Sequence, residues 1–144
     1  MAETKKTTGG CLCGAVRYET TAESEWAWYC HCHSCRKHTG APVVMFVGFP
    51  EDQIEWPAGE RALYESSPGV FRGFCRDCGT PLTYEGVWKG KKLFEFHIGT
   101  LDEPDKFPPN KHCLHNERIT WFDVSDDLRR DDADGKPYRH GPAV

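Results

Sequence analysis

Hydrophobic and polar residues alternate over short stretches of this chain. Val16 and Tyr18 lie two residues apart, and Trp26, Trp28 and Cys30 repeat the same period of two. Side chains two residues apart lie on one face of a β-strand, whereas a helix brings together residues three and four apart. The pattern therefore predicts a mostly β protein built of short strands.

Six further stretches have the composition of strands. A Ser-Ser-Pro-Gly sequence separates two of them, and because these residues favour tight turns, it predicts an antiparallel hairpin. A nearly continuous apolar run that ends at Pro50 reads as a buried strand. The six stretches are residues 43–49, 62–65, 70–74, 81–85, 93–98 and, as the last strand, 119–124.

Helical signals are weak. The best is a short helix at residues 34–39, which Gly40 and Pro42 would end, and residues 101–107 could form another helical turn. From Arg129 onward the chain is charged and poor in apolar residues, so we expect a mobile tail that includes a solvated run of aspartates. The chain thus predicts a single domain of short antiparallel strands with one or two short helical turns.

The bulk composition narrows the class of protein. A length of 144 residues suits one domain, and a net charge of −4 argues against general nucleic-acid binding. The first ten residues lack the apolar stretch of a signal peptide, and no run approaches the 18 apolar residues of a membrane span. We therefore expect a cytoplasmic protein without a membrane partner that handles a small molecule.

Seven of the eight cysteines fall into three tight clusters, Cys11-Leu12-Cys13, residues 30–35 and residues 75–78. In a reducing cytosol such thiols rarely form structural disulfides. Closely spaced cysteines there are more typical of metal sites, and a closed zinc site takes four ligands. Seven cysteines would therefore make one closed site and one site with a vacancy.

Two of the clusters each offer a pair of sulfurs. Cys11 and Cys13 are followed at once by Gly14, and Cys75 and Cys78 by a glycine too, which lets the backbone turn tightly around a metal. Two such pairs make an all-thiolate zinc site. We interpret these four cysteines as a structural zinc site that joins the N-terminus to the middle of the chain.

The third cluster offers Cys30, Cys32 and Cys35 within six residues. Three ligands with an open fourth position are typical of a catalytic zinc site, where the metal ionises a bound water or thiol. A closed site is the alternative, with a fourth ligand from elsewhere in the chain. The candidates for it are His38, His31, His33, His112, Cys113 and His115. Spacing alone also leaves open which clusters share a zinc, including a site of three cysteines plus Cys113.

Several motifs together resemble the glutathione-dependent formaldehyde-activating enzyme family, also called the CENP-V/GFA domain. The matching segments are residues 10–18, 30–42, 66–82 and 97–102, with Trp121-Phe122 later in the chain. The resemblance covers residues 9–128, which sets off residues 1–8 and 129–144 as tails around a GFA-like zinc domain.

The resemblance implies a tent-like β fold with two zinc ions per chain. It places Cys11, Cys13, Cys75 and Cys78 on the structural zinc, and it places Cys30, Cys32 and Cys35 on the active-site zinc. The family's activity is a carbon–sulfur lyase reaction that joins glutathione and formaldehyde into S-hydroxymethylglutathione. The expected partners are therefore a glutathione-like thiol and a small aldehyde.

A zinc-dependent carbon–sulfur lyase is thus the first functional hypothesis. The alternative is a non-catalytic zinc-binding module that carries a thiol or binds a protein partner. Arg36, Lys37, Arg72 and Arg76 lie near the clusters, where they would attract substrate carboxylates or simply be solvated. Cys113 departs from the family pattern, and we expect it to be a small buried hydrophobic residue.

Overall fold

The computed structural model describes residues 5–138, in which the chain forms two compact units. The first unit contains residues 5–25 and 47–107, and the second contains residues 26–46 and 108–138. Strands make up most of the regular structure, and α1 (His33–Thr39) is the one α-helix of the described residues. The predicted mostly β fold with little helix is confirmed.

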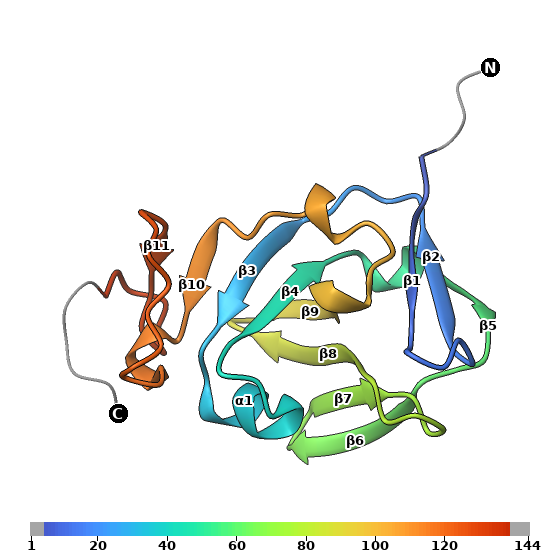
Figure 1. Ribbon diagram of the computed structural model, residues 1–144, viewed down its shortest axis with the longest axis horizontal. Helices are drawn as coiled ribbons and strands as arrows, with labels where there is room; N and C mark the ends of the chain where they lie inside the picture. Colours follow the sequence, from blue (N-terminus) through green and yellow to red (C-terminus); the bar gives the residue numbers. More distant parts are fainter. Residues whose placement is uncertain (1–4, 139–144) are drawn as a thin grey trace. The chain divides into compact units, whose positions relative to one another are not determined.

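Four consecutive strands of the first unit pair antiparallel, each with the next along the chain (Figure 1). Gly69 turns the first hairpin with a φ of 77°, and this is the hairpin that the Ser-Ser-Pro-Gly sequence predicts. Lys89 and Gly90 both have positive φ in the last hairpin, a turn that suits the right-handed twist of strands. The strands are β6 (Ala62–Ser67), β7 (Val70–Phe74), β8 (Pro81–Trp88) and β9 (Lys91–His97).

A three-stranded antiparallel sheet completes the regular structure of this unit, with strand order β1-β2-β5. Gly9 of the first strand also bridges Leu101, which follows a short 3-10 turn. The strands are β1 (Thr7–Gly10), β2 (Arg17–Thr20) and β5 (Ile54–Ala58), and the 3-10 turns are η1 (Glu51–Gln53), η2 (Ile98–Thr100) and η3 (Pro104–Lys106). The helical turn predicted at residues 101–107 corresponds to η3.

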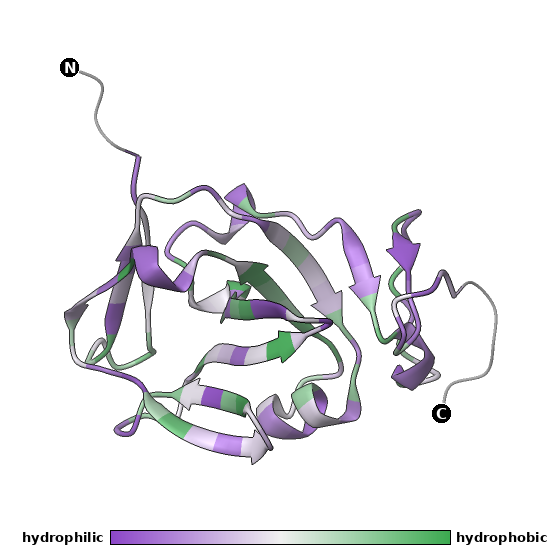
Figure 2. Cartoon of the chain, turned by 180° about the vertical axis from the view of Figure 1, so that it is seen from behind, coloured by the Kyte–Doolittle hydropathy of each residue, from purple (hydrophilic) through white to green (hydrophobic). Residues whose placement is uncertain are grey.

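Aromatic residues form the core of the first unit. The rings of Tyr18 and Phe96 stack with their centroids 3.7 Å apart, and Phe49 and Phe94 pack against the same phenylalanine. A Cβ on Gly9 would lie only 2.3 Å from the Tyr18 hydroxyl, so glycine lets β1 pass close over this ring. Figure 2 shows hydrophobic and hydrophilic bands alternating along the strands, as the sequence pattern predicts.

A buried ion pair braces the same core. Arg61 donates two hydrogen bonds to the Glu85 carboxylate, at 2.5 and 2.6 Å, and the two side chains are only 12% and 10% exposed. The guanidinium also lies over the ring of Trp56, 4.7 Å from its centroid. Removing one member of such a pair leaves an uncompensated buried charge.

We expect Arg61→Met to lower the free energy of unfolding by about 3–5 kcal/mol, because the Glu85 carboxylate would lose its cationic partner and keep only the hydrogen bond from the Thr83 hydroxyl. Chemical denaturation followed by tryptophan fluorescence measures this change. Lys6→Ala is the matched control, since Lys6 and Glu19 form an exposed pair, and it should leave the midpoint nearly unchanged. Equal effects of the two substitutions would contradict a structural role for the buried pair.

The second unit departs from the antiparallel pattern. Its three strands pair parallel, with β10 (Lys111–Cys113) between β3 (Trp26–Cys30) and β11 (Arg129–Arg130), as Figure 1 shows. The helix α1 follows β3, and the 3-10 turn η4 (His115–Glu117) follows β10. The strand β4 (Val44–Gly48) runs across the division between the units.

Of two predictions for the second unit, one is confirmed and one is wrong. The helix predicted at residues 34–39 is confirmed as α1, and Gly40 ends it in the left-handed conformation. The strand predicted at residues 119–124 is wrong, because this segment forms a turn and irregular chain in which Trp121 is 77% exposed. No helix within residues 5–138 is long and apolar enough to cross a membrane.

The domain boundaries at residues 9 and 128 stay a prediction. The expected solvated run of aspartates needs one correction, because Asp131 is buried. Its carboxylate accepts a hydrogen bond from Arg129 and lies 3.1 Å from the Lys111 ammonium. Two cations therefore compensate the buried charge. The structure of residues 139–144, the end of the predicted tail, lies outside the described residues.

Candidate functional site

Two loops of the first unit bring four cysteines together. The loop between β1 and β2 carries Cys11 and Cys13, and the Cys11 carbonyl accepts a hydrogen bond from the Gly14 N–H. The loop between β7 and β8 carries Cys75 and Cys78. This loop turns in the same way, because the Cys75 carbonyl accepts a hydrogen bond from the Gly79 N–H.

Both of these glycines require their conformational freedom. Gly14 has a φ of 81° and Gly79 a φ of 77°, values in the left-handed region that favours glycine. Each turn therefore points its two sulfurs to the same side of the loop. The tight turns predicted after the two cysteine pairs are confirmed, and a metal enclosed by these turns stays a prediction.

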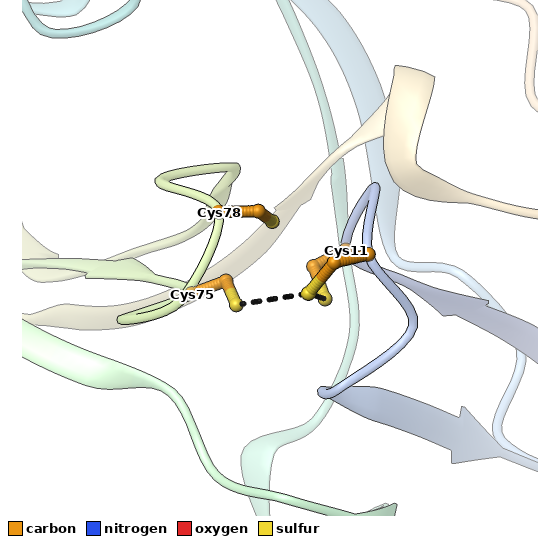
Figure 3. Close-up of side chains that lie close together, drawn as sticks. Cys11, Cys75 and Cys78 are labelled. Carbon is orange, nitrogen blue, oxygen red and sulfur yellow. Dashed lines mark hydrogen bonds between the residues drawn. The ribbon is translucent and has the colours of Figure 1, made fainter.

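The four sulfurs fit a zinc ion. They all lie within 4.8 Å of one another, with 3.6 Å between Cys11 and Cys13 and 3.8 Å between Cys13 and Cys75. Zn–S bonds of about 2.3 Å in a tetrahedron separate the sulfurs by about 3.8 Å. Figure 3 shows Cys75 and Cys78 pointing toward the loop that carries Cys11. The distances between the sulfurs match those expected for a zinc ion bound by four thiolates.

The thiols of this cluster differ in acidity. Hydrogen bonds from the Thr80 side chain and backbone lower the pKa of Cys78 to about 5. The Ala15 backbone N–H lowers the pKa of Cys13, but the neighbouring thiols of Cys11 and Cys78 outweigh it and raise this pKa overall. Four thiolates so close together repel one another, so full ionisation requires a cation among them.

The second unit gathers the other three cysteines at the junction of β3 and α1. Cys30 ends the strand, Cys32 is the N-cap of the helix, and Cys35 lies in the helix. The Cys32 sulfur accepts a hydrogen bond from the Cys35 N–H at 3.2 Å, and the sulfurs of Cys30 and Cys35 are 3.7 Å apart. This separation also suits zinc.

Within residues 5–138, no fourth histidine, cysteine or carboxylate joins this group of three. Hydrogen bonds with Cys32 and Cys35, together with burial, raise the pKa of Cys30 well above its usual range. A divalent cation would offset the charge of the three thiolates. Cys113 is the register partner of Cys30 in the parallel pair and is half-buried, so it is less buried than we expected.

Three histidines of the second unit gather with one another instead. His31, His112 and His115 are all buried and form a group of their own. Burial lowers the pKa of His31 to about 3 and that of His115 to about 4, so both imidazoles are neutral near pH 7. The sequence offered them only as separate candidates for a fourth zinc ligand. The spacing of His112 and His115 was a signal for a joint role.

His31 and His33, which alternate with the cysteines of residues 30–35, lie in different environments. His31 is 1% exposed, whereas the His33 side chain is 57% exposed and its Nδ1 lies 3.3 Å from a Glu117 carboxylate oxygen. Arg36 donates hydrogen bonds to the carbonyls of His31 and Glu117, so this guanidinium braces the local backbone. Arg36 therefore has a structural contact in addition to any substrate role.

The other cations differ in exposure. Arg72 is 4% exposed, donates to the Ser66 hydroxyl and lies over the Tyr84 ring, so it belongs to the sheet of the first unit. Lys37 and Arg76 are exposed. A role of these two in attracting a substrate stays a prediction.

These features define a small β protein with two cysteine centres suited to zinc. Residues 6–117 match the family described as glutathione-dependent formaldehyde-activating enzyme, and the chain belongs to this family. The resemblance that the cysteine motifs carry is thereby confirmed.

Three known proteins are similar to this chain, and one of them is named for the same family. A Schizosaccharomyces pombe protein described as an uncharacterized lyase is 30% identical over 86 residues, which are 60% of this chain and 61% of that protein. A putative glutathione-dependent formaldehyde-activating enzyme of Halomonas elongata is 24% identical over 81% of this chain and 79% of its own length.

A crystal structure of a Rhodobacter sphaeroides protein, a structural genomics target, has a TM-score of 0.52 and 23% identity. The match covers 66% of this chain and 87% of the Rhodobacter sphaeroides chain. This likeness concerns the fold alone. The family description and the names of both curated relatives are those of enzymes, and one of the relatives is named a lyase.

Proposed function

We propose that the protein is a carbon–sulfur lyase that adds a thiol to a small aldehyde and catalyses the reverse cleavage. Glutathione and formaldehyde are the proposed pair, with S-hydroxymethylglutathione as the product. One observation carries the proposal: among residues 5–138, three cysteines suited to zinc gather without a fourth histidine, cysteine or carboxylate in their group. Family membership supports the choice of substrates.

The reaction forms one carbon–sulfur bond, turns the carbonyl double bond into a single bond and moves one proton. The thiol sulfur forms a bond to the carbonyl carbon, and the thiol proton ends on the former carbonyl oxygen. No oxidant or reductant is required. Zinc held by Cys30, Cys32 and Cys35 would supply the positive charge that keeps the substrate sulfur ionised near neutral pH.

Short local elements support this arrangement of the site. Cys30 ends β3, Cys32 caps α1 and Cys35 lies at its start, so these elements would orient all three sulfurs toward a zinc ion. His33 is the exposed histidine beside Cys32, and we propose it as the group that passes a proton between solvent and the oxygen of the adduct. Glu117 orients its ring.

The cysteine chemistry also suggests where the protein works. Three free thiols in one site oxidise readily once the metal is lost. A reducing compartment prevents this oxidation, so we propose the cytoplasm as the location.

The proposed activity has a direct test. In exchange NMR spectroscopy of a glutathione–formaldehyde mixture, we expect the zinc-loaded protein to accelerate interconversion of free thiol and adduct. The chelator-treated protein, in which the thiols are kept reduced, is the control. Equal exchange rates in the two samples would refute the lyase assignment and favour the non-catalytic binding module.

A further inference from the structure

The three buried histidines of the second unit have no role in the proposed reaction. His31 directly follows β3, His112 lies in β10 and His115 begins η4. His31, His112 and His115 are 1%, 0% and 6% exposed, and each offers a ring nitrogen within 4.8 Å of the other two. Polar rings as buried as these need partners inside the protein.

Hydrogen bonding determines which nitrogen of His112 is available. Its Nε2 lies 3.0 Å from Asp126 Oδ2, and an ionised carboxylate can only accept, so Nε2 carries the proton. The lone pair of neutral His112 is therefore on Nδ1, which lies 2.8 Å from His31 Nε2. Tyr29 stacks on the imidazole of His112, with 4.5 Å between the ring centroids, and holds its plane.

Two nitrogens of the cluster remain unsatisfied. Among residues 5–138, the buried Nδ1 atoms of His31 and His115 have no hydrogen-bond partner. His31 faces His112 through its Nε2, so its Nδ1 points away from that contact, and the unpaired Nδ1 of His115 is the one that bears on a shared ion. Leaving a buried polar atom unpaired costs free energy, and such atoms in a folded protein often mark an unseen ion or water. The single hydrogen bond between His31 and His112 is not enough to pair the polar nitrogens of all three rings.

We propose that His31, His112 and His115 form a third metal site, which binds a divalent transition metal through three imidazole nitrogens. Imidazole suits zinc, nickel, copper and iron. The hydrogen bond between Asp126 and His112 has the form of the carboxylate–histidine pairs that orient metal ligands. Three ligands leave the metal one open position, as in catalytic rather than closed zinc sites.

The spacing of the three rings is compatible with one metal ion between them. Nitrogens about 2.0–2.1 Å from a tetrahedral metal lie about 3.3 Å apart. The contact of 2.8 Å between His31 and His112 would therefore open by about half an ångström as the metal replaces their shared proton. Arg130 does not oppose the ion with an uncompensated charge, because it donates to the Asp126 carboxylate and to the Val124 carbonyl.

Nickel uptake tests this site separately from the cysteine centres. Untagged protein that holds two zinc ions per chain, which fill the two cysteine centres and leave the histidine site free, is incubated with Ni²⁺, and X-ray absorption at the nickel edge reports only the added metal. We expect about one nickel per chain with nitrogen and oxygen ligands and no sulfur, while the zinc content stays unchanged. No uptake, or a shell that contains sulfur, would overturn the proposal.

Variants establish which residues bind the nickel. We expect His115→Phe, which retains an aromatic ring, to abolish stoichiometric uptake. We expect Asp126→Asn to weaken nickel binding about 10–100-fold through the orientation of His112. His97→Phe is the matched control, since His97 is a buried histidine of the first unit and should leave uptake unchanged. Uptake that survives both His115→Phe and Asp126→Asn would place the nickel elsewhere and contradict the assignment.

Discussion

Substitution of Cys75 by serine is expected to unfold much of the first unit. Cys75 is 1% exposed and is one of four clustered sulfurs through which a zinc ion would join the loop after β1 to the loop after β7. Structural zinc contributes about 10–16 kcal/mol to the folding of small zinc domains, as much as the whole stability of an ordinary domain of about 5–15 kcal/mol. Losing a ligand therefore removes most of what stabilises this unit.

Calorimetry and zinc analysis measure the effect of Cys75→Ser. We expect the unfolding midpoint to fall by more than about 10 °C, or the cooperative transition to vanish, because each kcal/mol shifts it by about 2–4 °C. The matched control is Cys113→Ser, a half-buried cysteine outside both cysteine groups, which should keep both zinc ions. A Cys75→Ser protein with two zinc ions and an unchanged midpoint would disprove the structural site.

Substitution of Cys32 by serine is expected to abolish activity without unfolding the protein. The sulfur of Cys32 caps α1 by accepting the Cys35 N–H, and serine is among the preferred residues at this position. The helix thus keeps its cap while the metal loses one of three ligands. We expect zinc content to fall from two to one per chain and adduct exchange to slow by at least about 100-fold.

The outcome of Cys32→Ser separates two accounts of the second cluster. Loss of the cooperative unfolding transition would indicate that this cluster is a second structural site. Full activity with one zinc per chain would show that the chemistry occurs elsewhere. Cys35→Ser provides a second test, since Cys35 lies in the same group of three sulfurs.

The three cysteine clusters could be predicted because their information is local, whereas the joining of Cys11 and Cys13 with Cys75 and Cys78 was fixed only by the family resemblance. Ligands one or two residues apart must point to the same side of a turn, and Gly14 and Gly79 mark the turns that achieve this. The hairpin between β6 and β7 was predictable for the same reason, since the turn residues lie between its strands. Such short-range patterns carry their geometry in the sequence.

The histidine cluster lacked a local signal of this kind. His31 and His112 are 81 residues apart and meet because β3 and β10 pair parallel, which no turn sequence specifies. The three residues of β10, Lys-His-Cys, also show no apolar alternation. The segment around Trp121 misled the prediction in the other direction. Its hydrophobic composition predicted a strand, but the structure has irregular chain there and leaves Trp121 exposed.

Cadmium NMR of the metal-exchanged protein tests the central claim most directly, which is that Cys30, Cys32 and Cys35 leave one metal position for a substrate thiol. Cadmium replaces zinc at thiolate sites, and each cysteine-bound ion gives its own resonance. We predict one resonance from a four-sulfur site and one from a three-sulfur site that Cys32→Ser removes. Added glutathione should shift only the three-sulfur signal toward the four-sulfur one. Two four-sulfur signals before glutathione is added, or no shift afterwards, would contradict the account.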